Sequence, residues 1–301
     1  MGIKYDNPTG KPPTLPGSLE FFLVLFTSPI MRGAVTVKLS NGVTYFYKTA
    51  GTGKIPIVLV HGYGFSSSIW EKILAILPPS YRAYAIDIRG FGDSDKPGIG
   101  YTYSQVVEDI AQFLDALKID KAIFVGHSLG GIFLQHFAVS HPDKMLALIL
   151  SNTFARNKPP AGINPDVRKR LDGYGSKEEN RKVFAETIPQ YFDAANLAYG
   201  DIGNFVEIGL KADNKALKEF LKLIYTAPAI PSEKYKSIKI PTLIIIGTHD
   251  PFAIFEVAVN INDGINGSRI YVVEYSGHSP MWERPDAWVR GVLDFLKDQG
   301  L

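Results

Sequence analysis

The chain has 301 residues, of which 46% are hydrophobic and 21% charged, and its formal net charge is +2 at pH 7. This length suits one large α/β domain with an insertion, or two domains. The small net charge, without a block of like charges, gives no reason to expect nucleic acid as a partner. The absence of cysteine excludes disulfides, thiolate metal sites and a cysteine nucleophile.

Residues 1–33 are predicted to form an N-terminal arm with an apolar helix. The apolar patch Leu19–Phe26 is too short to cross a bilayer, which takes about 20 residues. It contains Glu20, and no small-x-small cleavage site precedes Pro29, so it is not typical of a signal peptide. We therefore expect a cytoplasmic protein without an integral membrane segment. The patch is either a helix docked on the body of the protein or an exposed apolar element that covers an active-site mouth, a partner subunit or a lipid surface. A homodimer is also possible.

Strand and helix patterns alternate through residues 34–153 and again through 236–301. A hairpin is predicted around the turn Asn41-Gly42. Alternating strands and helices indicate a mostly parallel sheet of eight strands covered on both faces. The expected strands are 34–39, 43–49, 55–60, 81–88, a run ending before Ser128, 145–151, 242–246 and 269–274. The expected helices are 66–77, 103–117, the segment after Ser128, 252–262 and 285–297.

Residues 154–235 interrupt this alternation. They contain no buried strand-like run, only helical patterns and turn-rich stretches with paired prolines and isolated glycines. The predicted helices are 177–195, 202–212 and 214–225. We therefore expect an all-helical cap inserted over the sheet, where it would shape a binding pocket.

The chemistry centres on Gly126-His127-Ser128-Leu129-Gly130. An apolar strand pattern precedes this segment and an apolar helix pattern follows it, so Ser128 is predicted in a sharp strand–helix turn. A serine hydroxyl needs a base in hydrogen-bond contact, and the base needs an acid to orient it. His278 and Asp250 each follow a predicted strand, and the carboxyl ends of parallel strands meet at one edge of the sheet.

Asp250 has an alternative role as the cap of the helix predicted at 252–262. The other place for the acid follows the strand 145–151, but Ser151-Asn152-Thr153 stands there and offers no carboxylate. No His, Asp and Glu cluster has metal-ligand spacing, and no glycine-rich loop has the spacing for phosphates. We therefore expect neither a metal nor a cofactor.

With these motifs, the sequence resembles the α/β-hydrolase superfamily. The matching stretches are His61-Gly62-Tyr63-Gly64, Asp87–Ser94, Gly126–Gly131, Gly247–Asp250 and Gly277–Pro285. The resemblance implies the α/β-hydrolase fold, with Ser128 as nucleophile, His278 as general base and acid, and Asp250 as its orienting carboxylate. It also implies an oxyanion hole made by the backbone amides of Tyr63 and Leu129.

The residues Phe65, His127, Phe252 and Trp282 are expected to contribute to the substrate pocket. Its apolar character favours acyl or aryl esters, lactones included, and hence a carboxylic ester hydrolase. Gly277, His278, Trp282 and Glu283 also match a pattern of the C–C bond hydrolases of aromatic degradation, although these usually carry Asn at the position of His127. A perhydrolase or haloperoxidase-like enzyme and a non-catalytic binding relative stay open as further alternatives.

Overall fold

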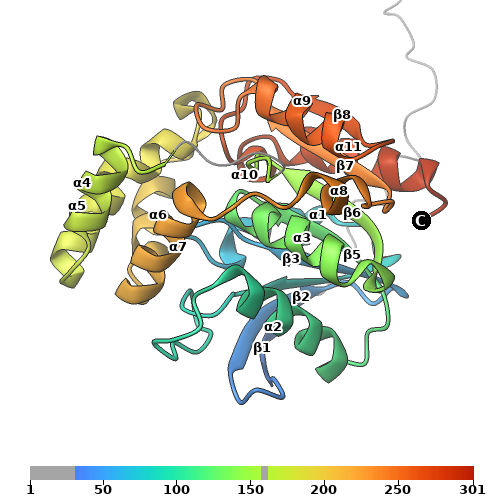
Figure 1. Cartoon of the computed structure of the whole chain (residues 1–301), viewed down its shortest axis with the longest axis horizontal. Coiled ribbons are helices and arrows are strands. Elements are labelled where there is room, and N and C mark those ends of the chain that lie inside the picture. The colour runs from blue at the N-terminus through green and yellow to red at the C-terminus, as the bar shows by residue number, and fades with distance from the viewer. Residues whose placement is uncertain (1–30, 157–161) are drawn as a thin grey trace, which may run out of the picture.

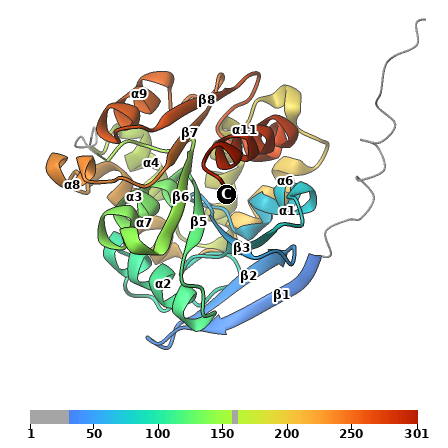
Figure 2. The same ribbon diagram turned by 90° about the vertical axis from the view of Figure 1, so that its right-hand side faces the viewer.

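One mixed sheet of eight strands runs through the protein, in a computed structural model that describes residues 31–156 and 162–301. The strands are β1 (Met31–Lys38), β2 (Thr44–Ala50), β3 (Ile55–Val60), β4 (Tyr81–Ile86), β5 (Ala122–His127), β6 (Met145–Ser151), β7 (Thr242–Gly247) and β8 (Arg269–Val273). Their order is β1-β2-β4-β3-β5-β6-β7-β8, so β1 and β8 form the two edges of the sheet (Figure 2). Strand β2 is antiparallel to β1 and β4, and the other neighbouring pairs are parallel. The predicted sheet is confirmed, while the apolar helix predicted near residues 19–26 lies outside the described residues.

The central strands are buried on both faces, which explains their uninterrupted apolar sequences. All six residues of β5 and of β7 are buried, whereas Arg269 and Val272 of the edge strand β8 are exposed. At the opposite edge, β1 begins at Met31 rather than at the predicted residue 34, because its backbone pairs with β2 as far as Ala50. A run of apolar residues was therefore enough to predict the core strands, whereas the start of the edge strand β1 is set by its pairing with β2.

Helices cover both faces of the sheet (Figure 2). On one face lie α1 (Glu71–Ile76), the short α10 (Pro280–Glu283) and α11 (Pro285–Asp298), and α1 is preceded by the 3-10 turn η2 (Ser67–Trp70). On the other face lie α2 (Tyr103–Ala116), α3 (Leu129–Ser140) and α9 (Phe255–Gly264), and a further 3-10 turn, η3 (Pro142–Lys144), leads into β6. Helix α11 buries Trp288, Val292 and Phe295 at helical spacing, so its apolar face packs onto the sheet.

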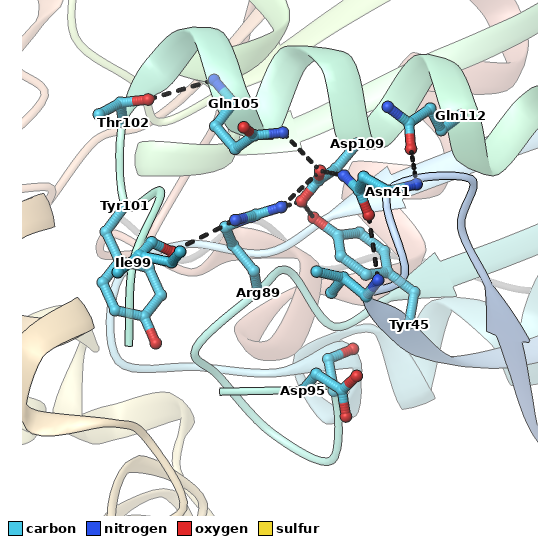
Figure 3. Close-up of polar contacts among 12 residues, drawn as sticks. Asn41, Tyr45, Arg89, Asp95, Ile99, Tyr101, Thr102, Gln105, Asp109 and Gln112 are labelled. Carbon is cyan, nitrogen blue, oxygen red and sulfur yellow. Dashed lines mark hydrogen bonds and ion pairs between the residues drawn. The ribbon is translucent and has the colours of Figure 1, made fainter. Parts of the chain in front are cut away.

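A buried ion pair fixes the loop that follows β4. Arg89 donates through Nη2 to Oδ1 of Asp109 at 2.7 Å, and both side chains are almost completely enclosed. The same carboxylate, on α2, accepts hydrogen bonds from the side chains of Tyr45, Asn41 and Gln105 (Figure 3). These partners satisfy both carboxylate oxygens, so the pair ties the loop, the helix and the β1–β2 hairpin together.

Between β6 and β7 the described residues form helices and no strand. The helices are α4 (Pro165–Gly173), α5 (Lys177–Thr187), α6 (Asp201–Gly209), α7 (Asn214–Thr226) and α8 (Ser232–Lys236), with 3-10 turns η4 (Ile188–Tyr191) and η5 (Ala194–Asn196). Helices α4 to α7 gather at one end of the sheet (Figure 1). The all-helical character of this segment agrees with the expectation, and the exact limits of a cap at 154 and 235 stay a prediction.

Two details of this segment differ from the expectation. The helix predicted over 177–195 ends at Thr187, because Pro189 has no amide to donate to the preceding turn, and the chain continues as η4. Helix α4 lies in a stretch that was expected to form turns. The Asn164 side chain accepts a hydrogen bond from the Val167 amide and Pro165 takes the first helical position, so a capped helix starts there.

Candidate active site

Ser128 lies in a sharp turn between β5 and α3. Its backbone has φ 51° and ψ −117°, a conformation that is strained for a residue with a Cβ. The neighbouring glycines make the turn sterically feasible. A Cβ on Gly126 would lie 2.7 Å from the backbone of Gly131, and a Cβ on Gly130 would lie 2.3 Å from the Val60 carbonyl oxygen. The turn presents the serine at the carboxyl end of β5 and the N-terminus of α3, which is the geometry of a nucleophile elbow.

His278 and Asp250 form a buried hydrogen-bonded pair. Nδ1 of His278 lies 2.8 Å from Oδ2 of Asp250, and both side chains are almost inaccessible to solvent. A carboxylate can only accept, so Nδ1 carries a proton, and in the neutral imidazole this leaves the lone pair on Nε2. Burial would raise the pKa of Asp250, but the charge of His278 and hydrogen bonds from His278, Asn152 and the Ala253 amide lower this pKa to about 2. The carboxylate is therefore ionised at neutral pH.

Asp250 also organises the turn that leads into α9. Its Oδ1 accepts hydrogen bonds from the amides of Phe252 at 2.8 Å and Ala253 at 3.0 Å. The expected helix start at Phe252 is therefore displaced, and α9 begins at Phe255. Asp250 is therefore not the cap of α9, whose N-cap is Ile254, and its two oxygens instead hold the preceding turn and face His278.

Asn152 supports the same carboxylate from the end of β6. Its Nδ2 donates to Oδ2 of Asp250 at 2.8 Å and to the Gly277 carbonyl oxygen at 3.3 Å. Asn152 has φ 49°, a left-handed conformation that asparagine tolerates better than most residues. The position without a carboxylate therefore supplies an amide that holds Asp250 against His278.

The backbone around His278 is tied to the helical segment. The amide of His278 donates to the Tyr191 carbonyl oxygen at 3.0 Å. The buried carboxylate of Glu283 accepts from the amides of Gly277 and Ser279, on either side of His278, and from the amide of Asp193. These bonds couple the position of the imidazole to the chain segment that follows α5.

Two backbone amides near Ser128 have no acceptor among the residues that the structure describes. The amides of Tyr63 and Leu129 donate no hydrogen bond within the described residues. The loop of Tyr63 is held by His61, whose Nδ1 donates to the Gly62 carbonyl at 2.8 Å while Nε2 accepts from the amide that follows β4. A Cβ on Gly62 would lie 3.0 Å from the Cβ of Ser128, so this loop passes close to the serine. Free donors at this place suit a developing oxyanion.

Ser128 and His278 line one small pocket, here called the inner cavity, of about 30 Å³. Through Arg170, Tyr225 and Phe252 it adjoins an outer cavity of about 430 Å³. The inner cavity holds about one water molecule, so most of any substrate must extend into the outer cavity or displace wall side chains. The remaining inner-cavity wall consists of Tyr63, Phe154, Tyr191, Leu221, Ile224 and Tyr225 with Phe252 and Arg170.

Of the four residues expected to contribute to the substrate pocket, Phe252 lines both cavities. His127 lies behind the site, where its Nε2 donates to the His278 carbonyl oxygen at 2.8 Å. Phe65 is buried, with its ring packed on His127 and on Phe205 of α6. Trp282 donates through Nε1 to Asp201 at 3.1 Å, at the contact between the body and the helical segment. These three residues support the walls and lie outside the lining of the inner cavity.

Three residues at this site were not singled out from the sequence. Asn152 was noted only for lacking a carboxylate, and Glu283 only as part of a family pattern. Arg170 was overlooked because its segment was interpreted as turns. Asn152 could have been identified as a site residue because it follows the end of a predicted strand. Glu283 could have been identified because it lies five residues after His278.

Residues 31–156 and 162–301 show neither a metal-binding cluster nor a membrane-spanning helix. Within those ranges no group of three His, Cys, Asp or Glu side chains is arranged to hold a metal ion. No helix in the same ranges is long and apolar enough to cross a membrane.

The sheet order, the elbow at Ser128 and the chain order Ser128, Asp250, His278 define the α/β-hydrolase class. The family described as "Alpha/beta hydrolase family" matches residues 57–291, and the chain belongs to this family. A pimeloyl-[acyl-carrier protein] methyl ester esterase of Pectobacterium carotovorum is 26% identical, over 84% of this chain and 99% of that protein. A 2-hydroxy-6-oxo-6-(2'-aminophenyl)hexa-2,4-dienoic acid hydrolase of Metapseudomonas resinovorans is 27% identical, over 85% and 89%. An esterase of Exiguobacterium antarcticum superimposes with a TM-score of 0.78 at 23% identity, over 88% of this chain and 100% of that one, which supports the fold.

Proposed function

We propose that the protein hydrolyses carboxylic esters of short to medium acyl or aryl chains, lactones included, through an acyl-enzyme on Ser128. One observation carries this proposal. Ser128, in an elbow with φ 51°, lines the same small cavity as His278, and His278 Nδ1 is fixed 2.8 Å from an ionised Asp250. This combination supplies a nucleophile, a base with a free Nε2 and an acid that stabilises the charged imidazole.

The proposed cycle follows from these atoms. Oγ of Ser128 attacks the ester carbonyl carbon while Nε2 of His278 takes the hydroxyl proton. The amides of Tyr63 and Leu129 donate to the oxyanion, and Asp250 stabilises the imidazolium. The C–O bond then breaks, and the alcohol leaves with the proton from His278. Water repeats the attack on the acyl-enzyme, which releases the acid and restores the Ser128 hydroxyl.

Among the described residues the Ser128 hydroxyl makes no hydrogen bond, so the contact with His278 must form when substrate enters. One similar protein is named a methyl ester esterase, which supports an ester as the substrate. Another relative is a dienoic acid hydrolase, which keeps a C–C bond hydrolase as the second candidate. Both reactions would use the same serine and histidine, so substrate preference decides between them.

The test compares Ser128→Ala with wild type on p-nitrophenyl acetate and butyrate, together with labelling by a fluorophosphonate. We expect Ser128→Ala to lose labelling and at least about 1,000-fold in kcat/KM. Ser80→Ala, at an exposed serine remote from the site, is the matched control and should behave as wild type. Substantial ester hydrolysis by Ser128→Ala would overturn the proposal. Cleavage of a 2-hydroxy-6-oxo-dienoate, with all esters left intact, would favour the second candidate.

A further inference from the structure

Arg170 stands at the junction of the two cavities. It lies on α4 and lines both the inner cavity, with Ser128, and the outer cavity. Its Nη2 donates to the Tyr191 hydroxyl at 3.0 Å, and its guanidinium carbon lies 5.6 Å from the centre of the Tyr63 ring. Arginine stays protonated in proteins. A permanent positive charge therefore forms part of the wall beside the candidate nucleophile.

No carboxylate balances this charge within the part of the chain that the structure describes. The exposed side chains of Asp166, Lys169 and Glu186 lie on the outer cavity, but the only ion pair among them joins Lys169 to Glu186. The Nε of Arg170 is closed off from solvent and has no hydrogen-bond partner in the described ranges. The buried hydroxyl of Tyr174, at the end of the same helix, also has none there.

The aromatic neighbours do not supply the missing charge. Burial raises the pKa of the hydroxyls of Tyr63 and Tyr174, so both are neutral at pH 7. A half-buried cation without a counter-charge is less favourable than a paired one, and a guanidinium pairs best with a planar carboxylate that accepts two hydrogen bonds. The positive charge of Arg170 therefore favours binding of an anionic group, and the described residues do not supply one.

We propose that Arg170 binds a carboxylate of the substrate, so that the preferred substrates are esters that carry a free carboxylate a few carbons from the ester bond. This inference rests on the proposed ester hydrolysis. Arg170 lines the inner cavity together with Ser128 and also lines the outer cavity, so a substrate that extends from Ser128 into the outer cavity passes the guanidinium within a few carbons of its ester bond. The carboxylate would receive hydrogen bonds from the guanidinium where Arg170 lines both cavities.

The experiment measures kcat/KM for charged and neutral pairs of esters. Monomethyl glutarate is compared with dimethyl glutarate, which places the carboxylate on the acyl side, and 4-acetoxybutanoate with butyl acetate, which places it on the alcohol side. The variants are Arg170→Gln and Arg170→Lys, and circular dichroism reports whether each is folded. Arg168→Gln, at an exposed position two residues earlier on α4, is the control with the same change in net charge.

In wild type we expect the charged ester of at least one pair to be preferred. Arg170→Gln should lower the charged-to-neutral ratio by about 10- to 100-fold, with Arg170→Lys in between and Arg168→Gln unchanged. A ratio within twofold of wild type in Arg170→Gln, with neutral esters still cleaved, would overturn this inference and leave ester hydrolysis standing.

If wild type cleaves no ester, the proposed function fails, and the carboxylate site is tested by binding alone. Glutarate is then titrated calorimetrically into Ser128→Ala and into Ser128→Ala with Arg170→Gln. Binding that weakens at least tenfold in the double variant supports the carboxylate site, whereas equal binding overturns it.

Discussion

Replacing Glu283 by glutamine tests how the loop that carries His278 is held. Glu283 is 7% exposed, and its carboxylate accepts from the amides of Gly277, Ser279 and Asp193 at distances of 2.8 to 3.1 Å. Asn196 adds a longer contact at 3.4 Å. No cation pairs with Glu283 in the described part of the chain, so these donors are what keeps the carboxylate buried.

The expected magnitude follows from the number of acceptors. Glutamine offers one oxygen, and its NH2 group must face at least one backbone amide that Glu283 now satisfies. A hydrogen bond to a charged group contributes about 1.5 to 3 kcal/mol, and the bonds that remain weaken because their acceptor becomes neutral. Removing a buried charge offsets part of this loss. We expect Glu283→Gln to lower the free energy of unfolding by about 2 kcal/mol.

The assay combines urea unfolding with kcat for p-nitrophenyl acetate. The glutamine NH2 group would face either the Ser279 amide or the amides of Gly277 and Asp193, so in both cases an amide next to His278 loses its acceptor. The imidazole should then move, and kcat should fall about tenfold or more. Glu274→Gln removes an exposed carboxylate four residues before His278 and is the matched control, with both quantities unchanged. The reasoning fails if Glu283→Gln unfolds within about 0.5 kcal/mol of wild type and keeps its kcat.

Four further predictions concern Asp250, Arg89 and Tyr225. Asp250→Asn should keep the fold but lower kcat by about 10⁴-fold, because Asn favours the wrong tautomer of His278, as steady-state kinetics would show. The pKa of Asp250 is lowered to about 2 from 3.8, so its carboxylate adds about 2 kcal/mol to the free energy of unfolding. This contribution is present above pH 4 and is lost as the pH falls to 2. Urea unfolding of wild type and Asp250→Asn at pH 5 and pH 2 would measure it. Arg89→Met leaves Asp109 as a buried unpaired charge and should cost about 3 to 5 kcal/mol in chemical unfolding, and a loss below 1 kcal/mol would contradict the bracing role. Tyr225→Ala opens the junction of the cavities and should raise kcat/KM for an octanoyl ester relative to an acetyl ester, whereas an equal change for both would show that Tyr225 does not limit substrate size.

The sequence predicted the sheet and the elbow because their determinants are local. A run of apolar residues suffices to identify a strand that is buried on both faces, as in β5 and β7. At the elbow, Gly126 and Gly130 are required by close backbone contacts, so the positions of the glycines predict the turn as well as its serine. Asp250 and His278 were predictable for a related reason, since parallel strands bring their carboxyl ends to one edge.

Long-range side-chain contacts were harder to foresee. His127 precedes the serine and was expected in the pocket, but its ring turns behind the site because Nε2 finds the His278 carbonyl, 151 residues away in the chain. Asn152 reaches Asp250 across 98 residues. Neither contact could be predicted from the neighbouring sequence, because a histidine or an asparagine at the end of a strand can bond to many different partners.

Arg170 shows where closer attention to periodicity would have helped. Val167, Leu171 and Tyr174 are buried at helical spacing, and Arg170 lies on the same face of α4, three residues after Val167. The many charged residues of this stretch, exposed on the opposite face, concealed the pattern. An arginine on the apolar face of a helix must find a counter-charge or a ligand when that face is covered, because it cannot lose its proton. The structure covers this face and supplies aromatic rings in place of a carboxylate, so the unbalanced charge points to the substrate.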